Sequence, residues 1–222
     1  MRQIGLFGGT FNPVHLGHVR VIREVKAGFK LDEILIIPSA LPPHKISENV
    51  VDAKDRIEMI RLAFLNDPDF VISDVELNRT GPSYTIDTVR YFRSILPEGT
   101  RLYLIMGLDA FLEINTWKSF KDLFLLIPFI VMYRSVGGKE PKTSAWESLG
   151  HYLRSNISEG YTFSSSQSTY IHDKKQPVFV FDVSPVDISS TTIREHIKKG
   201  VSIKHLVPEI IENFIKTKGL YL

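Results

Sequence analysis

The amino-acid sequence predicts a doubly wound α/β fold with a mostly parallel sheet. Short continuous apolar runs recur along the chain, which is typical of strands buried on both faces of a sheet. Stretches with helical spacing of apolar residues separate these runs, as strand–helix–strand connections require. The length of 222 residues fits one ordinary α/β domain.

Six apolar runs are the predicted strands of this sheet. Each is too short for a helix of ordinary length, and each is bounded by glycine, proline or a polar residue. In chain order, the predicted strands are residues 4–7, 34–37, 70–72, 102–106, 129–133 and 178–181.

Helices are predicted between the strands and after the last one. In the second helix, Ile57, Ile60, Ala63 and Phe64 share one face, as in a helix that packs on a sheet. The C-terminal portion of the chain is also helical in this prediction. The predicted helices span residues 19–27, 52–66, 85–96 and 208–218, and another starts at residue 189 or 190.

The most apolar segment, residues 123–133, is shorter than the roughly 20 residues that span a bilayer. Pro128 interrupts it, so the segment is predicted to form a helix, a break and a strand. Residues 1–9 lack the long apolar region of a secretory signal. We therefore expect a soluble, cytoplasmic protein with no membrane partner.

Residues 135–176 interrupt the alternation of strands and helices. The segment contains one amphipathic helix with Trp146, Leu149 and Leu153, followed by a serine-rich stretch. Its apolar content is too low for a core of its own. We therefore expect a single domain over residues 1–222, with a surface insertion at 135–176.

The composition excludes several classes of function. Lysine and arginine number 27 against 25 acidic residues, and the net charge of +2 gives no general attraction to nucleic acid or to an anionic membrane. The absence of cysteine excludes disulfides, zinc–thiolate sites, iron–sulfur clusters and thiol nucleophiles. Any anion that the protein binds must therefore be met by local groups.

The first predicted strand runs into a loop that begins with Gly8 and Gly9. Glycines at a strand-to-helix junction let the backbone approach a ligand, and the helix N-terminus offers N–H groups to an anion. This is the geometry of a nucleotide site. A P-loop would need a lysine followed by serine or threonine, and a dinucleotide loop would need another glycine spacing, so neither class is supported.

His15 and His18 lie three residues apart, on one face of the first turn of the following helix. Both rings can donate hydrogen bonds to phosphate oxygens, and the helix dipole adds positive potential. Gly17 keeps that face open. Alternatively, one histidine only caps the junction; a metal pair is a poorer reading, because two ligands without a third make a poor site.

A second candidate anion site lies at residues 188–194, at the start of a helix that Gly200 ends. Ser189 or Ser190 is the predicted N-cap. Several hydroxyls and Arg194 within one turn suit a polyphosphate. A capped helix with an arginine is common and does not by itself indicate an anion site. The prediction therefore depends on combining this motif with the glycine and histidine motif that follows the first strand.

Two of these motifs give the chain a resemblance to the nucleotidyltransferase superfamily, which carries H-x-G-H and I-S-S-T-x-x-R signatures. Within it, the sequence is similar to the bacterial nicotinate-nucleotide adenylyltransferases. Asn12 departs from that pattern, because many relatives carry aspartate there, and residues 135–176 look longer than usual. The matching motifs are His-Leu-Gly-His at 15–18, Pro-Pro-His-Lys at 42–45, Ser-Tyr-Thr-Ile-Asp-Thr at 83–88, Gly-Leu-Asp at 107–109 with Trp117-Lys118, and Ile-Ser-Ser-Thr-Thr-Ile-Arg at 188–194.

The resemblance implies a Rossmann-like nucleotidyltransferase fold and an activity in NAD biosynthesis. The adenylyl group of ATP would pass to nicotinate mononucleotide, giving nicotinate adenine dinucleotide (deamido-NAD) and pyrophosphate. A nucleotide phosphate is already an anion, so positioning and charge neutralisation suffice without a general base. Mg²⁺ would arrive with ATP, without dedicated protein ligands. No nucleic-acid partner is expected, and a homo-oligomer is left open.

The resemblance also implies roles for individual residues. His18 would stabilise charge on the α-phosphate, and His15 would contact neighbouring triphosphate oxygens. The β- and γ-phosphates would be held by Ser190, Thr191 and Arg194, and Lys45 would bridge to the incoming phosphate. The ATP-binding set comprises Gly8, Gly9, Thr10, Phe11, Asn12, His15, His18, Gly107, Asp109, Ile188, Ser189, Ser190, Thr191 and Arg194. The mononucleotide-binding set comprises His44, Lys45, Tyr84, Thr85, Asp109 and Trp117.

The choice of mononucleotide rests on two features. Tyr84 and Thr85 lie at the start of a predicted helix, whose N–H groups favour a carboxylate over a carboxamide unless Ser83 or Thr85 caps it. Trp117 offers a flat face for a pyridine ring, or else belongs to the core. The alternatives are an adenylyltransferase for nicotinamide mononucleotide or pantetheine phosphate, and a non-catalytic ATP-sensing module.

Overall fold

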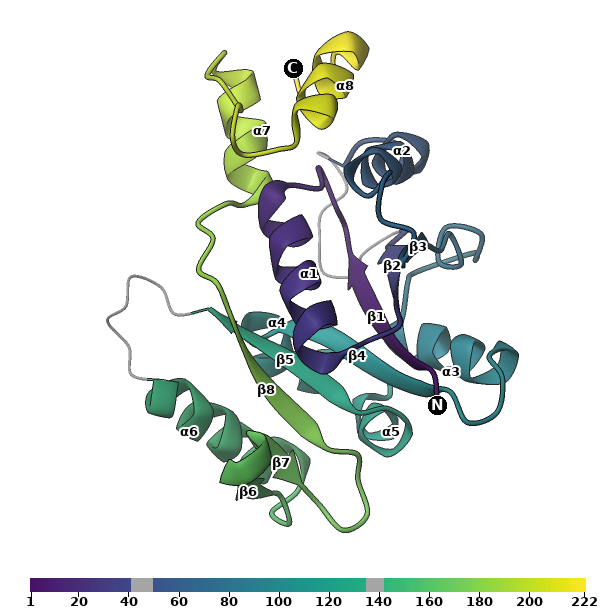
Figure 1. The fold of residues 1–222 in the computed structure, drawn as a ribbon, viewed down its shortest axis with the longest axis vertical. Helices are drawn as coiled ribbons and strands as arrows, with labels where there is room; N and C mark the ends of the chain where they lie inside the picture. Colours follow the sequence, from purple (N-terminus) through teal and green to yellow (C-terminus); the bar gives the residue numbers. More distant parts are fainter. Residues whose placement is uncertain (41–49, 135–141) are drawn as a thin grey trace.

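The computed structural model describes residues 1–40, 50–134 and 142–222. Within these ranges, the strands form one eight-stranded sheet in the order β3-β2-β1-β4-β5-β8-β7-β6 (Figure 1). The pairings from β3 to β8 are parallel, and β7 and β6 extend the sheet with antiparallel pairings. The predicted doubly wound, mostly parallel α/β fold is therefore confirmed.

All six predicted strands are present, each within two residues of its expected bounds. The short strands β6 and β7 were not predicted. The strands are β1 (Gln3–Gly9), β2 (Glu33–Pro38), β3 (Phe70–Ile72), β4 (Arg101–Gly107), β5 (Phe129–Arg134), β6 (Thr162–Ser164), β7 (Thr169–Ile171) and β8 (Val178–Val183).

The predicted helices are also present. Around the second of them, Ile60 and Phe64 of the predicted face are buried, whereas Ile57 and Ala63 are only half-buried. Arg56 and Met59, which were not predicted to face inward, are buried as well. The helices are α1 (Leu16–Phe29), α2 (Ala53–Ala63), α3 (Thr85–Ile95), α4 (Leu108–Leu112), α5 (Phe120–Leu126), α6 (Lys142–Tyr152), α7 (Ser190–Lys198) and α8 (Glu209–Lys218).

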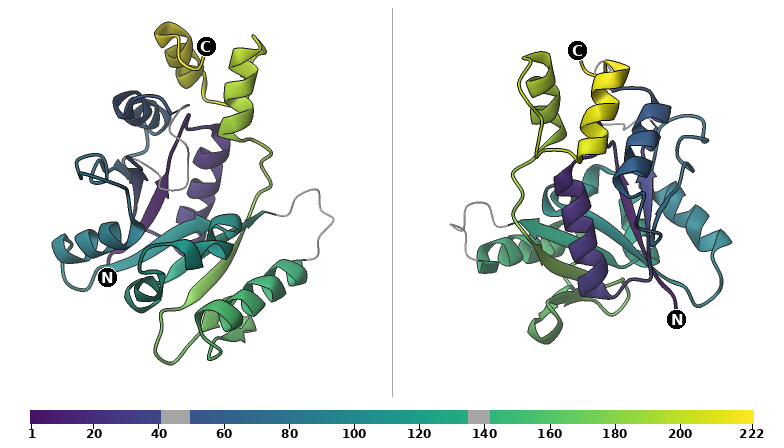
Figure 2. Two further views of the ribbon diagram at one scale, coloured as in Figure 1. Left: turned by 180° about the vertical axis from the view of Figure 1, so that it is seen from behind. Right: turned by 45° about the horizontal axis from the view of Figure 1, so that its top comes forward.

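Helices cover both faces of the sheet, because successive side chains of a strand point to opposite faces. On β4, Leu104 and Met106 join one core cluster, while Tyr103 and Ile105 join the other. Helices α3 to α6 contribute to the first cluster, and α1, α2, α7 and α8 contribute to the second. Figure 2 shows α7 and α8 together beyond one end of the sheet, near the start of α1.

The described part of the predicted insertion, residues 142–176, contains α6, β6 and β7. Leu149, Leu153, Tyr161 and Tyr170 are buried in the same cluster as the sheet, so this segment adds to the existing core. The single domain with a surface insertion stays a prediction. Across the described residues, none of the helices is long and apolar enough to span a membrane.

Candidate active site

The candidate site lies where the strand order of the sheet reverses. From β1 the chain winds outward through β2 to β3 and then returns to β4, on the other side of β1. In open α/β sheets, ligands bind at this switch point, outside the carboxyl ends of the strands. Gly9 ends β1 and Gly107 ends β4, and both line a cavity of about 410 Å³.

The loop after β1 is held by a buried arginine of α2. Arg56 is 2% exposed, and its guanidinium donates to the carbonyl oxygens of Thr10 (2.9 Å), Ser39 (2.7 Å) and Val51 (3.3 Å). Burial lowers the pKa of Arg56, and these carbonyl dipoles replace the water that the charge has lost. The guanidinium therefore ties the loop after β1 to β2 and to the start of α2. Gly8 and Gly9, predicted to begin this loop, are instead the last two residues of β1.

The two histidines of the loop lie against each other at the start of α1. Their ring centroids are 3.7 Å apart, and the planes meet at 25°. His15 is the N-cap, and its Nδ1 accepts a hydrogen bond from the backbone N–H of His18 at 3.3 Å. The shared face is thus confirmed, and so is a capping role for one histidine. Because Nδ1 accepts, the proton of the neutral His15 ring resides on Nε2, which becomes a donor.

Gly17 makes this stacked arrangement possible. A Cβ atom at that position would lie 2.9 Å from Nδ1 of His15 and 3.0 Å from its Cε1, closer than side chains tolerate. The glycine therefore leaves room for the His15 ring, in line with the predicted open face.

The second motif begins α7, and its N-cap is Ser189, not Ser190. The Ser189 Oγ accepts from the backbone N–H of Thr192 at 3.0 Å. The Ser190 hydroxyl instead donates to the carbonyl of Pro13 at 2.9 Å. The hydroxyls of this motif thus serve two purposes, since one caps the helix and the other attaches the helix to the first loop.

Arg194 completes the junction between the two motifs. Its Nη1 donates to the carbonyl of Asn12 at 2.8 Å, and its Nη2 donates to Oγ1 of Thr191 at 3.3 Å. Asn12 precedes Pro13 through a cis peptide bond and is 4% exposed. The structure therefore brings together two motifs that are about 180 residues apart in the sequence.

A cavity beside this junction brings together three of the six predicted mononucleotide-binding residues. Tyr84, Thr85 and Trp117 line it, along with backbone from Gly8 to Thr10 and with Gly107. Side chains of β1, β2 and β4 make an apolar wall. Three other polar lining residues, Ser83, Thr88 and Lys118, belong to the motifs that carry the resemblance but were given no binding role. The remaining ones, which the sequence did not indicate, are Ser39, Glu76, Glu113 and Thr116.

The N-terminus of α3 opens toward this cavity without a side-chain cap. Tyr84 is the N-cap residue and makes no side-chain cap hydrogen bond. The Ser83 hydroxyl, one of the two predicted caps, accepts instead from the backbone N–H of Ala40 at 2.9 Å. The first backbone N–H groups of the helix therefore remain suited to an anionic group of a ligand.

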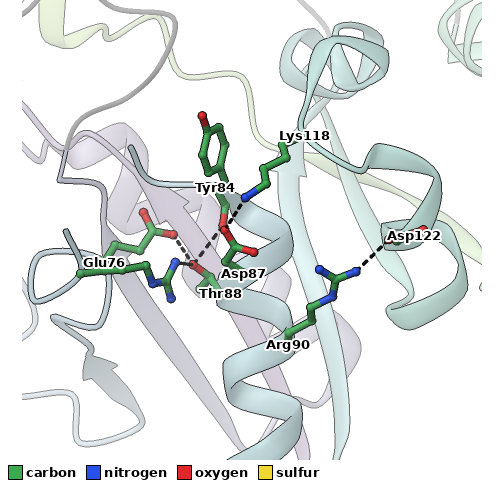
Figure 3. A network of polar contacts seen from close by, with 8 residues as sticks. Glu76, Tyr84, Asp87, Thr88, Arg90, Lys118 and Asp122 are labelled. Atoms are coloured by element: carbon green, nitrogen blue, oxygen red, sulfur yellow. Dashed lines mark hydrogen bonds and ion pairs between the residues drawn. The ribbon is translucent and has the colours of Figure 1, made fainter. Parts of the chain in front are cut away.

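Polar contacts fix the first turn of α3 (Figure 3). The Thr88 hydroxyl donates to Oε1 of the buried Glu76 at 2.7 Å, while Lys118 donates to Oδ2 of Asp87 at 3.1 Å. The Lys118 Nζ also lies 4.4 Å from the centroid of the Tyr84 ring. Lys118 therefore places an ammonium group, paired with the Asp87 carboxylate, beside the start of α3.

The other three predicted mononucleotide-binding residues are not placed around the cavity. His44 and Lys45 lie outside the described residues. Asp109 is exposed in the first turn of α4, and its Oδ1 occupies the space where a side chain on Gly107 would begin. Around the two motifs, the groups on offer are imidazoles, hydroxyls and a guanidinium. Such groups suit phosphate oxygens, and a metal ion would fit here through the phosphates that carry it.

Comparisons with known proteins agree with this geometry. Residues 6–196 match the profile of the cytidylyltransferase-like family. The chain is 39% identical to a "Probable nicotinate-nucleotide adenylyltransferase" of Desulfatibacillum aliphaticivorans, over 99% of this chain and all of that one. It is 36% identical to a protein of the same name from Thermoanaerobacter sp. strain X514, over 99% of this chain and 94% of the relative.

A solved structure with a similar fold is the Plasmodium falciparum nicotinic acid mononucleotide adenylyltransferase complexed with NaAD. The match covers 100% of this chain and 98% of that one, with a TM-score of 0.73 and 18% sequence identity.

Proposed function

The chain belongs to the cytidylyltransferase-like family, and on that premise we propose that it transfers the adenylyl group of ATP to nicotinate mononucleotide, forming nicotinate adenine dinucleotide and pyrophosphate. The names of its relatives over nearly their full length support the reaction. The structural observation that supports this reaction most directly is the hydrogen bond from Arg194 to the Asn12 carbonyl. This bond joins the two motifs near the switch point of the sheet, which supports one shared site for a triphosphate.

The reaction needs no protein base. A phosphate oxygen of the mononucleotide attacks the α-phosphorus of ATP, a new P–O bond forms, and the bond to the bridging oxygen of the β-phosphate breaks. The departing pyrophosphate takes the electron pair of that bond. Because the attacking oxygen is already anionic, the protein contributes position and positive potential.

The two motifs divide this task. His18, at the start of α1, stabilises charge on the α-phosphate, and the His15 Nε2–H donates to a neighbouring phosphate oxygen. Arg194 and the N-terminus of α7 hold the β- and γ-phosphates. Lys45, which lies outside the described residues, keeps its predicted role toward the incoming phosphate. Magnesium bound to the triphosphate supplies further charge neutralisation.

The cavity next to these motifs receives the pyridine ring. Trp117 provides a flat apolar face, and the uncapped start of α3 provides N–H groups for the carboxylate. Lys118 adds positive charge near Tyr84. These groups favour the acid mononucleotide over the neutral amide. They also favour it over pantetheine phosphate, which has no anionic ring substituent.

The function is tested by incubating the protein with ATP, Mg²⁺ and nicotinate mononucleotide and measuring both pyrophosphate and the dinucleotide. Equal amounts of the two products are expected. ATP binding without release of pyrophosphate would favour the alternative of a sensing module and would contradict the proposal. The cytoplasmic location expected from the sequence stays a prediction.

Trp117→Ala is expected to raise the KM for the mononucleotide about tenfold and to leave the KM for ATP within about twofold, because base–aromatic stacking contributes roughly 1–3 kcal/mol. Steady-state kinetics with each substrate varied in turn check this. Lower thermal stability with an unchanged KM for the mononucleotide would place Trp117 in the core instead.

A further inference from the structure

One buried contact reaches the loop between β1 and α1 from the far end of the sequence. The hydroxyl of Tyr221, three residues after the end of α8, donates to Oδ1 of Asn12 at 2.9 Å. Tyr221 is 9% exposed and belongs to the core cluster that also contains Ile211 and Ile215 of α8. The residue is therefore fixed by packing, and its hydroxyl is directed into the loop.

Asn12 passes this constraint to the predicted phosphate-binding groups. Its Oδ1 also accepts from the backbone N–H of Val51 at 3.2 Å, so its side chain is held from two sides. Its own carbonyl oxygen accepts from Nη1 of Arg194 at 2.8 Å. The position of one asparagine thus determines where the Arg194 guanidinium can lie. Asn12 is also the third residue before His15, so the same contact fixes the approach of the loop to α1.

The local backbone and the electrostatics agree with a specific role for this hydroxyl. Tyr221 has a φ of 67°, a left-handed conformation that is costly for a tyrosine and is retained only where the surroundings impose it. Burial raises the pKa of Tyr221, although the charges on Arg194 and Arg56 act in the opposite direction. The hydroxyl therefore stays protonated and remains a donor around neutral pH.

We infer that Tyr221 is a positioning residue for the triphosphate of ATP, acting through Asn12 on Arg194 and on the loop that leads to the two histidines. The inference rests on the proposed function in that the bound nucleotide is taken to be ATP. It assigns a role in nucleotide binding to the segment that follows α8.

Tyr221→Phe removes the hydroxyl and keeps the ring in the core, so it isolates the contact. We expect the KM for ATP to rise about three- to tenfold, the range that corresponds to the loss of one net hydrogen bond. The KM for nicotinate mononucleotide is expected to stay within about twofold, because the cavity that receives it is built from other residues. KM does not depend on the concentration of folded enzyme, so partial unfolding does not imitate this result.

The matched control is Tyr91→Phe, which removes a hydroxyl from a tyrosine that is 42% exposed on α3. This variant is expected to keep both KM values. Asn12→Ala removes the acceptor, and the double variant with Tyr221→Phe is expected to show the KM for ATP of Asn12→Ala alone, because the two changes delete the same contact.

An unchanged KM for ATP in Tyr221→Phe, with or without a lower melting temperature, would overturn the inference, and so would additive effects in the double variant. The affinity for a non-hydrolysable ATP analogue, measured by calorimetry, gives the same comparison without turnover. It therefore tests the role of Tyr221 even if the wild-type protein fails to transfer the adenylyl group, which would contradict the proposed function alone.

Discussion

His18→Ala is expected to lower kcat by roughly 10²–10³, the usual effect of removing one preorganised donor at a developing charge. The fold should persist, because the helix cap uses the backbone N–H of His18 and the alanine retains it. The lost ring contacts are those with His15, Phe11 and Phe7. Pyrophosphate release under saturating ATP and nicotinate mononucleotide measures the effect, and circular dichroism confirms that the variant is folded.

The control for this variant is His151→Ala, which removes an exposed histidine from α6, away from both motifs. It should turn over like the wild type. If His18→Ala also keeps the wild-type kcat, then His18 has no part in the chemical step and the assignment of the stacked pair to the triphosphate is wrong.

Arg56→Leu is expected to reduce the free energy of unfolding by about 3–5 kcal/mol, since it leaves buried carbonyl oxygens without a donor. The three carbonyls belong to Thr10, Ser39 and Val51, so the loss also frees the loop that leads to the histidines. Urea denaturation followed by circular dichroism measures the change.

Arg61→Leu is the matched control on the same helix. Its side chain is 62% exposed and its ion pair with Glu58 lies at the surface, so the expected change is about 0.5 kcal/mol or less. Equal losses for Arg56→Leu and Arg61→Leu would mean that the buried hydrogen bonds of Arg56 contribute little to stability.

Local patterns were sufficient for the strands of the parallel sheet and for the helix starts. A short, continuous apolar run such as residues 129–133 is typical of a buried strand and of few other structures. Pro128 separates α5 from β5, as predicted. The strands β6 and β7, which flank the serine-rich stretch, escaped prediction because each is only three residues long. Their place in the sheet depends on β8, which is not visible in the local sequence.

Within the site, the sequence predicted the groups but not what holds them. Arg56 lies in an amphipathic helix, where a charged residue reads as solvent-facing, yet its partners are three backbone carbonyls from distant segments. The Tyr221–Asn12 contact spans 209 residues and has no sequence signature. Asn12 was predicted as an ATP-binding residue, whereas its Oδ1 is engaged inside the protein by Val51 and Tyr221.

The preference between acid and amide follows from the uncapped start of α3 and from Lys118, which both favour an anionic ring substituent. The most direct measurement is therefore kcat/KM for nicotinate mononucleotide against nicotinamide mononucleotide, with ATP and Mg²⁺ saturating. We expect the acid to be preferred by at least about tenfold, the equivalent of 1.4 kcal/mol. Equal values, or a higher value for the amide, would contradict the account.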